Sequence, residues 1–358
     1  MGRPTKINRF GKYNGSDNLG KWGQDLFHHV RWKGWGLEMK SQRVWLWLLL
    51  TFAIISISSA GAVFQLMEEV PPLLRASWRF QLTALLMAPV FFVQFREMKQ
   101  DQNAMKRFNL SETRWILFGS GISLGLHMGA WVWSLDNTSL THSLLFVTIH
   151  PLIIVFGAIL LGKYVPKQQT LGASIGFIGG GITLLGISVE TDVTLLGDIA
   201  AIVGAFAVVG YFLAGRKLRQ WMPLFVYIFP VTFIAGIFLA VMSIMLEGSV
   251  FSLSDESISL FGWMSSTWIL YVLYLAVFPG IVGHAGIGAV LRWFPPIIVS
   301  VAYLFEPLVG SFIGWVLGTT DVPSLWTWVG ATVLLIGTVL VIKGDEELNL
   351  QERGNDYG

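Results

Sequence analysis

Ten apolar segments of 18 to 25 residues divide this chain, and polar connections separate them. A helix rises 1.5 Å per residue, so about 20 residues cross the ~30 Å hydrocarbon core of a bilayer. The pattern therefore predicts an all-α integral membrane protein with ten transmembrane helices. The segments run at about 44–66, 72–95, 113–134, 138–161, 169–188, 198–215, 222–246, 267–291, 295–317 and 325–342.

The last two segments repeat a pattern found about 156 residues earlier. Glu306-Pro307 stands in the ninth segment where His150-Pro151 stands in the fourth. Neither a charged group nor a helix-breaking proline is expected at bilayer depth without a role. Further matched positions are Gly162 with Gly318, Val165-Pro166 with Val322-Pro323, Gly172 with Gly330, and Gly180 with Gly337. The chain is therefore predicted to be a twofold repeat.

Each repeat holds five segments, and this odd number decides how the two copies lie in the membrane. The second copy has to enter from the opposite side, so we predict two inverted five-helix repeats, an arrangement common in secondary transporters. His150 and Glu306 then fall near the midplane on equivalent helices. The predicted parts are a basic N-terminal segment at 1–43, repeats at 44–188 and 198–343, and a cytoplasmic tail at 344–358.

Lys and Arg are confined to alternate connections between the segments. Of 24 such residues, 22 lie before the first segment, after the last one, or at 96–114, 163–167, 216–219 and 292. The other connections carry Asp and Glu but no Lys or Arg. The positive-inside rule then predicts cytoplasmic termini and a multi-pass protein of a plasma or bacterial inner membrane. The two exceptions, Arg75 and Arg79, stand at the outer start of the second segment.

The composition excludes several kinds of chemistry. Hydrophobic residues make up 54% and charged residues 13%, about half the charged share of a soluble domain. The absence of Cys excludes disulfides, a thiol nucleophile and Cys-ligated metals. A phosphate-binding loop of the form G-x-x-x-x-G-K-[ST] is also absent, which argues against ATP-driven pumping. We expect no cofactor, no metal and no nucleic-acid partner.

Ionisable groups inside the predicted spans are the candidates for function, because each is costly in hydrocarbon unless it faces a cavity or a partner. Glu306 is the one carboxylate away from the segment ends. It can carry a proton or bind a substrate cation, or it can bond to backbone groups that Pro307 leaves free. Among the histidines, His150 is favoured by its symmetry with Glu306, and His284 by its place in the broken run PGIVGHAGIG.

Two further candidates have equally open interpretations. Arg79 can hold an anionic substrate or gate the outer mouth, or it can extend outward to the interface. Trp131 can offer a stacking surface or belong to an interfacial aromatic belt. The complete candidate set for substrate binding and coupling is Glu306, His150, His284, His127, Arg79, Trp131, Tyr211 and Tyr303.

Glycines recur every four residues in three of the segments, a spacing that lets helix backbones approach closely in lipid. We interpret these glycines as packing positions. Two of the stretches, GISLG and GASIG, also fit the serine-hydrolase pattern, but that pattern needs a strand-turn-helix elbow that a spanning helix does not supply. The positions are Gly121, Gly125 and Gly129, then Gly172, Gly176 and Gly180, then Gly310, Gly314 and Gly318.

The chain resembles an EamA-type transporter of the drug/metabolite transporter superfamily. In the first half the resemblance lies in SSAGAVFQLMEEVPPLLRASWRF. In the second half, the closer match, it lies in GDIAAIVGAFAVVGYFLAGRKLR, VFPGIVGHAGIGAVLRWFPPIIVSVAYLFEPLVGSFIGWVLG and VGATVLLIGTVLVIKG. The resemblance implies ten helices in two inverted repeats and a secondary carrier with a central cavity, lined mainly by segments 1, 3, 4, 6, 8 and 9.

Three classes of function compete. The leading hypothesis is a secondary carrier that moves a small metabolite, such as an amino acid, nucleobase, sugar or drug-like solute, by alternating access coupled to protons or to exchange. An intramembrane enzyme is disfavoured, because aspartyl chemistry needs two carboxylates and the spans hold one. A non-transporting receptor or scaffold is disfavoured by the inverted repeat. The expected partners are the solute, membrane lipids and, as a candidate assembly, a second copy in a homodimer.

Overall fold

The computed structural model describes residues 38–138, 140–184, 194–252, 255–319 and 325–355. These residues form helices joined by short connections, and they contain no strand beyond an isolated bridge between Val250 and Ser259. The prediction of an all-α protein is confirmed for this part of the chain. Residues 1–37, most of the predicted basic N-terminal segment, lie outside the described residues.

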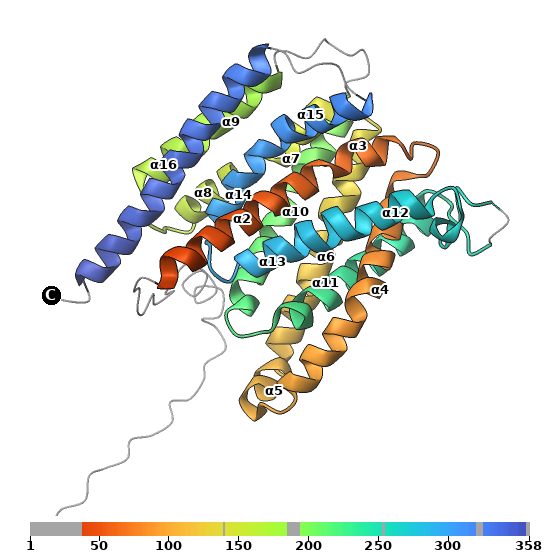
Figure 1. Cartoon of the computed structure of the whole chain (residues 1–358), viewed down its shortest axis with the longest axis horizontal. Coiled ribbons are helices and arrows are strands. Elements are labelled where there is room, and N and C mark those ends of the chain that lie inside the picture. Colours follow the sequence, from red (N-terminus) through yellow and green to blue (C-terminus); the bar gives the residue numbers. More distant parts are fainter. Residues whose placement is uncertain (1–37, 139, 185–193, 253–254, 320–324, 356–358) are drawn as a thin grey trace, which may run out of the picture.

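The helices follow the predicted segments in order (Figure 1). The first half contains α2 (Glu38–Ser58), α3 (Ala60–Gln65), α4 (Pro72–Met98), α5 (Gln102–Phe108), α6 (Ser111–Leu135), α7 (Leu140–Val147), α8 (His150–Leu160) and α9 (Lys167–Leu184). The second half contains α10 (Leu195–Arg219), α11 (Leu224–Leu246), the 3-10 turn η1 (Gly262–Met264), α12 (Ile269–Leu275), the π-helix η2 (Ala276–Ala285), α13 (Gly286–Val290), α14 (Pro296–Ala302), the 3-10 turn η3 (Tyr303–Phe305), α15 (Glu306–Leu317) and α16 (Leu325–Asn355).

Seven helical stretches of the described chain are long and apolar enough to cross a membrane. They coincide with seven of the ten predicted segments. The other three segments, at 138–161, 169–188 and 325–342, are helical where the structure describes them, in α7, α8, α9 and α16, but these helices are shorter or less apolar. The count of ten spans therefore stays a prediction. Helix α16 also runs into the predicted polar tail at 344–358, whose Glu, Leu, Gln and Arg residues are good helix formers.

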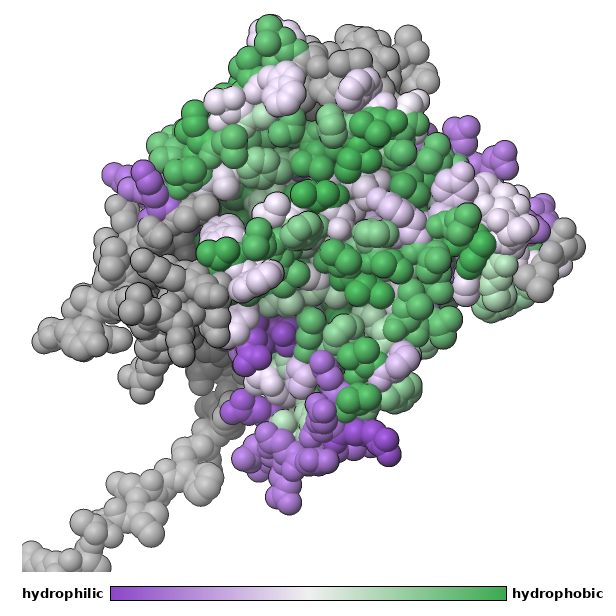
Figure 2. Space-filling view, in the orientation of Figure 1, coloured by the Kyte–Doolittle hydropathy of each residue, from purple (hydrophilic) through white to green (hydrophobic). Residues whose placement is uncertain are grey.

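The surface separates an apolar belt from polar ends. Figure 2 shows hydrophobic residues over the middle of the visible face, with hydrophilic residues gathered around α5 and beyond α3 and α12. Exposed apolar side chains include Leu160, Leu246, Leu325 and Trp328. So large an apolar exposure is unusual for a soluble protein and is what lipid-facing helices require.

Helices from the two halves of the chain pack against one another. The closest pairs are α9 with α16, α6 with α10, α4 with α11, and α6 with α11, and Figure 1 shows α9 and α16 running side by side. Further contacts join α2 with η2, α4 with η2, α7 with α10, and α2 with α15. No long connection separates two independent bundles in the described chain, so the interior lies between the halves.

The glycine repeats explain how closely these helices approach. A Cβ atom added to Gly121 or Gly125 would lie 2.6 or 2.7 Å from Ile234 or Phe238 of α11. One added to Gly172 would lie 2.8 Å from the carbonyl oxygen of Gly337 in α16. Such distances are well inside van der Waals contact, so a larger residue would separate the helices. The packing interpretation is confirmed at these positions.

The last glycine of the third set is different. Gly318 has a positive φ of 75° and ends α15, with open space where a Cβ would stand. Gly162, just after the end of α8, also has a positive φ, of 66°. In both places the amide of the glycine bonds three residues back and the next amide bonds five residues back, which is the Schellman pattern of a helix C-terminus. Gly318 is therefore a helix stop rather than the packing position that we predicted.

Helices α4 and α11 cap each other's first turns. The carboxylate of Glu247, at the end of α11, accepts hydrogen bonds from the amides of Leu73 and Leu74 at 2.7 and 3.1 Å. At the opposite ends, the side-chain oxygen of Gln94 in α4 accepts from the amide of Phe225 at 2.9 Å. Neither helix has a side-chain cap of its own, because each begins after a proline. Burial raises the pKa of Glu247 above its ordinary value, and its hydrogen bonds oppose that shift.

We expect Glu247→Ala to destabilise the fold more than Gln94→Ala does. The first change removes the acceptor for two amides and the second the acceptor for one, and an unsatisfied buried donor costs about 1–3 kcal/mol. The expected losses are about 2 and about 1 kcal/mol, measured by thermal unfolding of the detergent-solubilised protein. Equal losses would show that the caps at the two ends do not contribute as their geometry indicates.

Candidate functional site

Irregular stretches in three membrane helices position the predicted site residues. Helix α7 ends at Val147, and α8 begins three residues later with His150 and a proline. The π-helix η2 carries His284. The 3-10 turn η3 begins with Tyr303 and leads into Glu306, the first residue of α15, which is again followed by a proline. Proline fits the first turn of a helix because the amide there has no intrahelical partner, and π and 3-10 insertions often mark functional sites.

Seven of the eight predicted residues are joined in one buried region by direct or electrostatic contacts. Arg79 is close enough to interact electrostatically with Glu306, Tyr303, His127 and His284. His150 interacts in the same way with His127. Tyr211 packs its ring 6.3 Å from that of His284. All of them, together with Trp131, are at least 93% buried.

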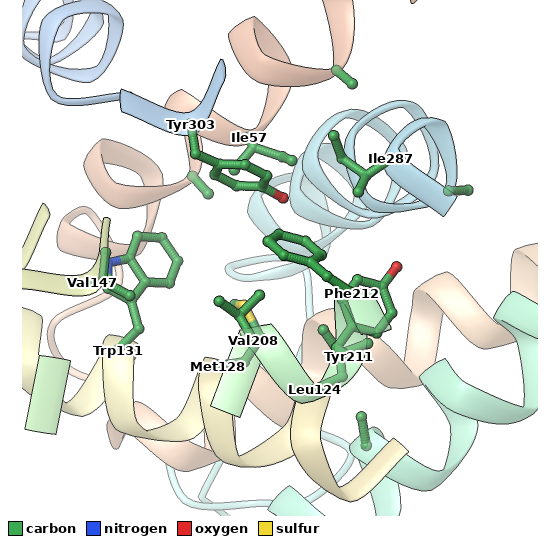
Figure 3. Packing of buried hydrophobic residues seen from close by; sticks show 14 of the residues in the cluster. Ile57, Leu124, Met128, Trp131, Val147, Val208, Tyr211, Phe212, Ile287 and Tyr303 are labelled. Atoms are coloured by element: carbon green, nitrogen blue, oxygen red, sulfur yellow. The ribbon is translucent and has the colours of Figure 1, made fainter. Parts of the chain in front are cut away.

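Aromatic rings hold this region together across the two halves. The imidazole of His150 meets the rings of Tyr303 and Phe212 edge-on, with centroid distances of 5.3 and 5.7 Å. Phe212 and Tyr303 also contact each other at 5.7 Å. Figure 3 shows Tyr303, Phe212 and Trp131 converging from different helices. The eighth residue, Trp131, contacts Phe64 of α3 at 6.0 Å, so it lies in the packed interior rather than in an interfacial belt.

Several buried polar atoms in this region lack a hydrogen-bond partner among the described residues. They are Nε and Nη2 of Arg79, Nε1 of Trp131, Nδ1 of His150, Nδ1 of His284, and the hydroxyl oxygens of Ser300 and Tyr303. Buried polar atoms are normally satisfied by protein, water or ligand. They come from α4, α6, α8, η2, α14 and η3, and a polar ligand or ordered water would satisfy them.

Two of the predicted residues already use their polar groups. His127 places Nδ1 3.0 Å from the carbonyl oxygen of Gly204, and because a carbonyl only accepts, Nδ1 carries the proton and Nε2 is left as an acceptor. The hydroxyl of Tyr211 donates to the carbonyl oxygen of His284 at 3.4 Å. His127 therefore presents one free nitrogen, and Tyr211 supports the backbone of the π-helix.

Glu306 and Arg79 are near each other without forming an ion pair. Among the described residues, no charged atom of Arg79 lies within 4.0 Å of the Glu306 carboxylate, and Glu306 accepts no hydrogen bond. The site therefore holds one cation and one carboxylate that are both available. The described residues contain no group of three or more His, Asp or Glu placed to hold a metal ion.

Sequence reasoning did not single out Ser300 and Gln65, whose side-chain oxygens are also buried without a partner among the described residues. A signal was present for Ser300, since it is the only polar side chain in the run PIIVSVA of α14. Gln65 is the last residue of α3, where a polar group at a helix end is unremarkable.

Long apolar helices enclosing a buried polar cluster define a multi-pass membrane protein. Residues 43–185 match the EamA-like transporter family model. This part of the chain is an EamA-like transporter domain of the drug/metabolite transporter superfamily, which confirms the resemblance seen in the sequence. The match lies in the first half, although the second half held the features that we judged closer to the family.

Two further comparisons cover most of the chain. It is 24% identical over 303 residues to "Uncharacterized transporter YyaM" of Bacillus subtilis (strain 168), covering 82% of this chain and 91% of that protein. A crystal structure described only as that of a protein has a TM-score of 0.62 at 18% identity, covering 84% of this chain and 97% of that one. The second likeness concerns the fold alone.

Proposed function

We propose that this membrane transporter is a secondary carrier that moves a small metabolite by alternating access, with the buried polar cluster as its substrate and coupling site. The observation that carries the proposal is the set of unpartnered polar atoms, contributed by both halves of the chain. Because every candidate residue is at least 93% buried, a solute reaches the cluster only when helices move.

Contacts at both ends of the bundle support two closed gates. At the predicted outer end, Glu247 binds the first turn of α4, and the Thr138 hydroxyl donates to Asp198 at 2.8 Å. At the predicted cytoplasmic end, Gln94 binds the first turn of α11, and Lys217 pairs with Glu112 at 2.8 Å. Each contact joins the first half to the second, so opening either end separates the halves there.

The packing pattern supports an inverted repeat. A twofold axis that relates residues 44–188 to 198–343 exchanges α2 with α10, α4 with α11, and α6 with the helix containing η2. This exchange makes the α6–α10 contact equivalent to the α2–η2 contact. It likewise makes the α6–α11 contact equivalent to the α4–η2 contact. All four contacts are present. The reciprocal caps of α4 and α11 obey the same exchange. Random packing of ten helices has no reason to repeat its contacts in this way.

We expect single cysteines to report this topology directly, because the chain has no native Cys. Cysteines replacing the exposed Glu69 and Glu256 should react with a membrane-impermeant maleimide added to intact cells. Cysteines replacing the exposed Gln100 and Gln220 should react only after permeabilisation. Each half supplies one residue of each kind, so the reverse pattern in either half would contradict the inversion.

Transport is tested with the purified chain in proteoliposomes. Amino acids, nucleobases, sugars, sugar phosphates and drug-like amines are offered for uptake and for counterflow against the same unlabelled solute. A carrier shows saturable uptake that an internal pool of its substrate accelerates. Binding without counterflow for every solute would favour a receptor instead.

A further inference from the structure

The two buried arginines of α4 differ in their surroundings. Arg75 forms an ion pair with Asp136 and donates to the carbonyl oxygens of Met67 and Val70 at 3.2 and 3.5 Å. Among the described residues, Arg79, one turn further along the helix, has a weak contact from Nη1 to the sulfur of Met128 at 3.7 Å and lies 5.6 Å from the ring of Phe80. Arg75 therefore has a counterion and two carbonyl acceptors and leaves its Nε without a partner, whereas Arg79 has no counterion in contact and leaves both Nε and Nη2 without a partner.

The free atoms of Arg79 form one edge of its guanidinium group. Nε and Nη2 are both fully buried and have no hydrogen-bond partner in the part of the chain that the structure describes. Their N–H bonds point in nearly the same direction, and this fork matches the two oxygens of a carboxylate. A lysine at the same place would offer a point charge without the fork.

Three of the other unpartnered groups of the cluster can also donate a hydrogen bond. Trp131 Nε1 can only donate, and the hydroxyls of Tyr303 and Ser300 can donate. A ligand that supplies acceptors would therefore satisfy more of the site than one that supplies donors. The single carboxylate, Glu306, leaves little net positive charge beside Arg79, which disfavours a dianion such as a phosphate ester.

We propose that Arg79 binds the carboxylate of a monoanionic solute through its Nε and Nη2 edge. This inference rests on the proposed function, because it assigns a chemical class to the substrate of the same cluster. In this arrangement Arg79 binds the ligand's carboxylate instead of pairing with Glu306. Glu306 can then bind a proton or a cationic group of the same ligand.

The test compares carboxylates with their amides, which have nearly the same shape but lack the negative charge of the carboxylate. Acetate with acetamide, phenylacetate with phenylacetamide, and L-leucine with L-leucinamide are titrated against the full-length protein in detergent at neutral pH, and thermal unfolding is followed. Since a ligand that binds the folded state raises its unfolding temperature, at least one acid should stabilise the protein and its amide should not. Equal effects of acid and amide in every pair, or stabilisation by inorganic phosphate alone, would overturn the proposal.

Variants of Arg79 locate the effect. Arg79→Gln should weaken binding of the effective acid by roughly 10- to 100-fold, the range expected for a charged hydrogen bond. Arg79→Lys keeps the positive charge but not the forked pair of donors. Its affinity for the acid should lie between those of wild type and Arg79→Gln. The exposed Lys106→Gln in α5 serves as the control and should bind like wild type. Wild-type affinity in Arg79→Lys would exclude recognition by the fork, and this variant remains informative if Arg79→Gln does not fold.

Counterflow separates this inference from the carrier proposal. If proteoliposomes exchange a solute but show no preference for acids over amides, the result supports the carrier proposal and contradicts the proposed role of Arg79. If acids bind in detergent through Arg79 but no solute is exchanged, the result supports the binding site and contradicts the transport mechanism.

Discussion

We expect Glu306→Gln to abolish substrate accumulation driven by a pH gradient while it leaves substrate exchange intact. Glu306 is the carboxylate of the buried cluster, and it accepts no hydrogen bond from a described residue. Glutamine keeps its shape but cannot ionise. One proton moved per substrate supports about tenfold accumulation per pH unit, so the inside-to-outside ratio should fall from that level to one. Exchange needs no net proton transfer and should continue.

The measurement uses proteoliposomes with an imposed pH gradient and the substrate identified by counterflow. The matched control is Glu69→Gln, which changes an exposed carboxylate in the connection before α4. If folded Glu306→Gln protein still accumulates substrate in response to pH, Glu306 does not couple transport to protons. His150 and His284 then become the next candidates, because each has a buried ring nitrogen without a partner among the described residues. Loss of accumulation and exchange together with loss of folded protein would instead indicate a structural role.

We expect Asp136→Asn to lower the free energy of unfolding by about 3 kcal/mol, because it leaves the guanidinium of Arg75 charged and buried without its counterion. Arg75 is completely buried and the Asp136 side chain is 31% exposed, which places the loss at the lower end for a broken buried pair. Burial raises the pKa of Asp136 above its ordinary value, and the charge of Arg75 opposes that shift. Denaturation of the purified protein in detergent measures the loss.

A second ion pair in the chain supplies the control. Lys217 and Glu112 are 36% and 54% exposed, and exposed pairs contribute about 0–1 kcal/mol, so Glu112→Gln should change stability little. The double variant Arg75→Gln with Asp136→Asn should be more stable than Asp136→Asn alone, since it removes the uncompensated charge. A double variant that is less stable than either single variant would show that each residue stabilises the fold independently of the other.

The sequence alone determined the protein class and suggested the candidate residues of the site. Hydrophobic runs of membrane-spanning length have few alternatives to helices, because lipid offers the backbone no hydrogen-bond partners. The cost of an ionisable group in hydrocarbon is equally general, which is why Glu306, Arg79 and the three histidines were found without a structure. The helix breaks at His150, His284 and Glu306 were also indicated, since proline and glycine mark them in the sequence.

Only the tertiary structure decided which of these groups have partners. Arg75 and Arg79 stand one turn apart on the same helix, and the sequence does not distinguish them. The difference arises because Asp136, 61 residues away from Arg75, is brought to it by the packing of α4 against the end of α6, while the Nε and Nη2 atoms of Arg79 have no hydrogen-bond partner among the described residues. The caps that Glu247 and Gln94 place on distant helices have the same origin. Hydrophobic periodicity is local and survives in a single sequence, whereas a hydrogen bond between distant residues depends on the relative placement of whole helices.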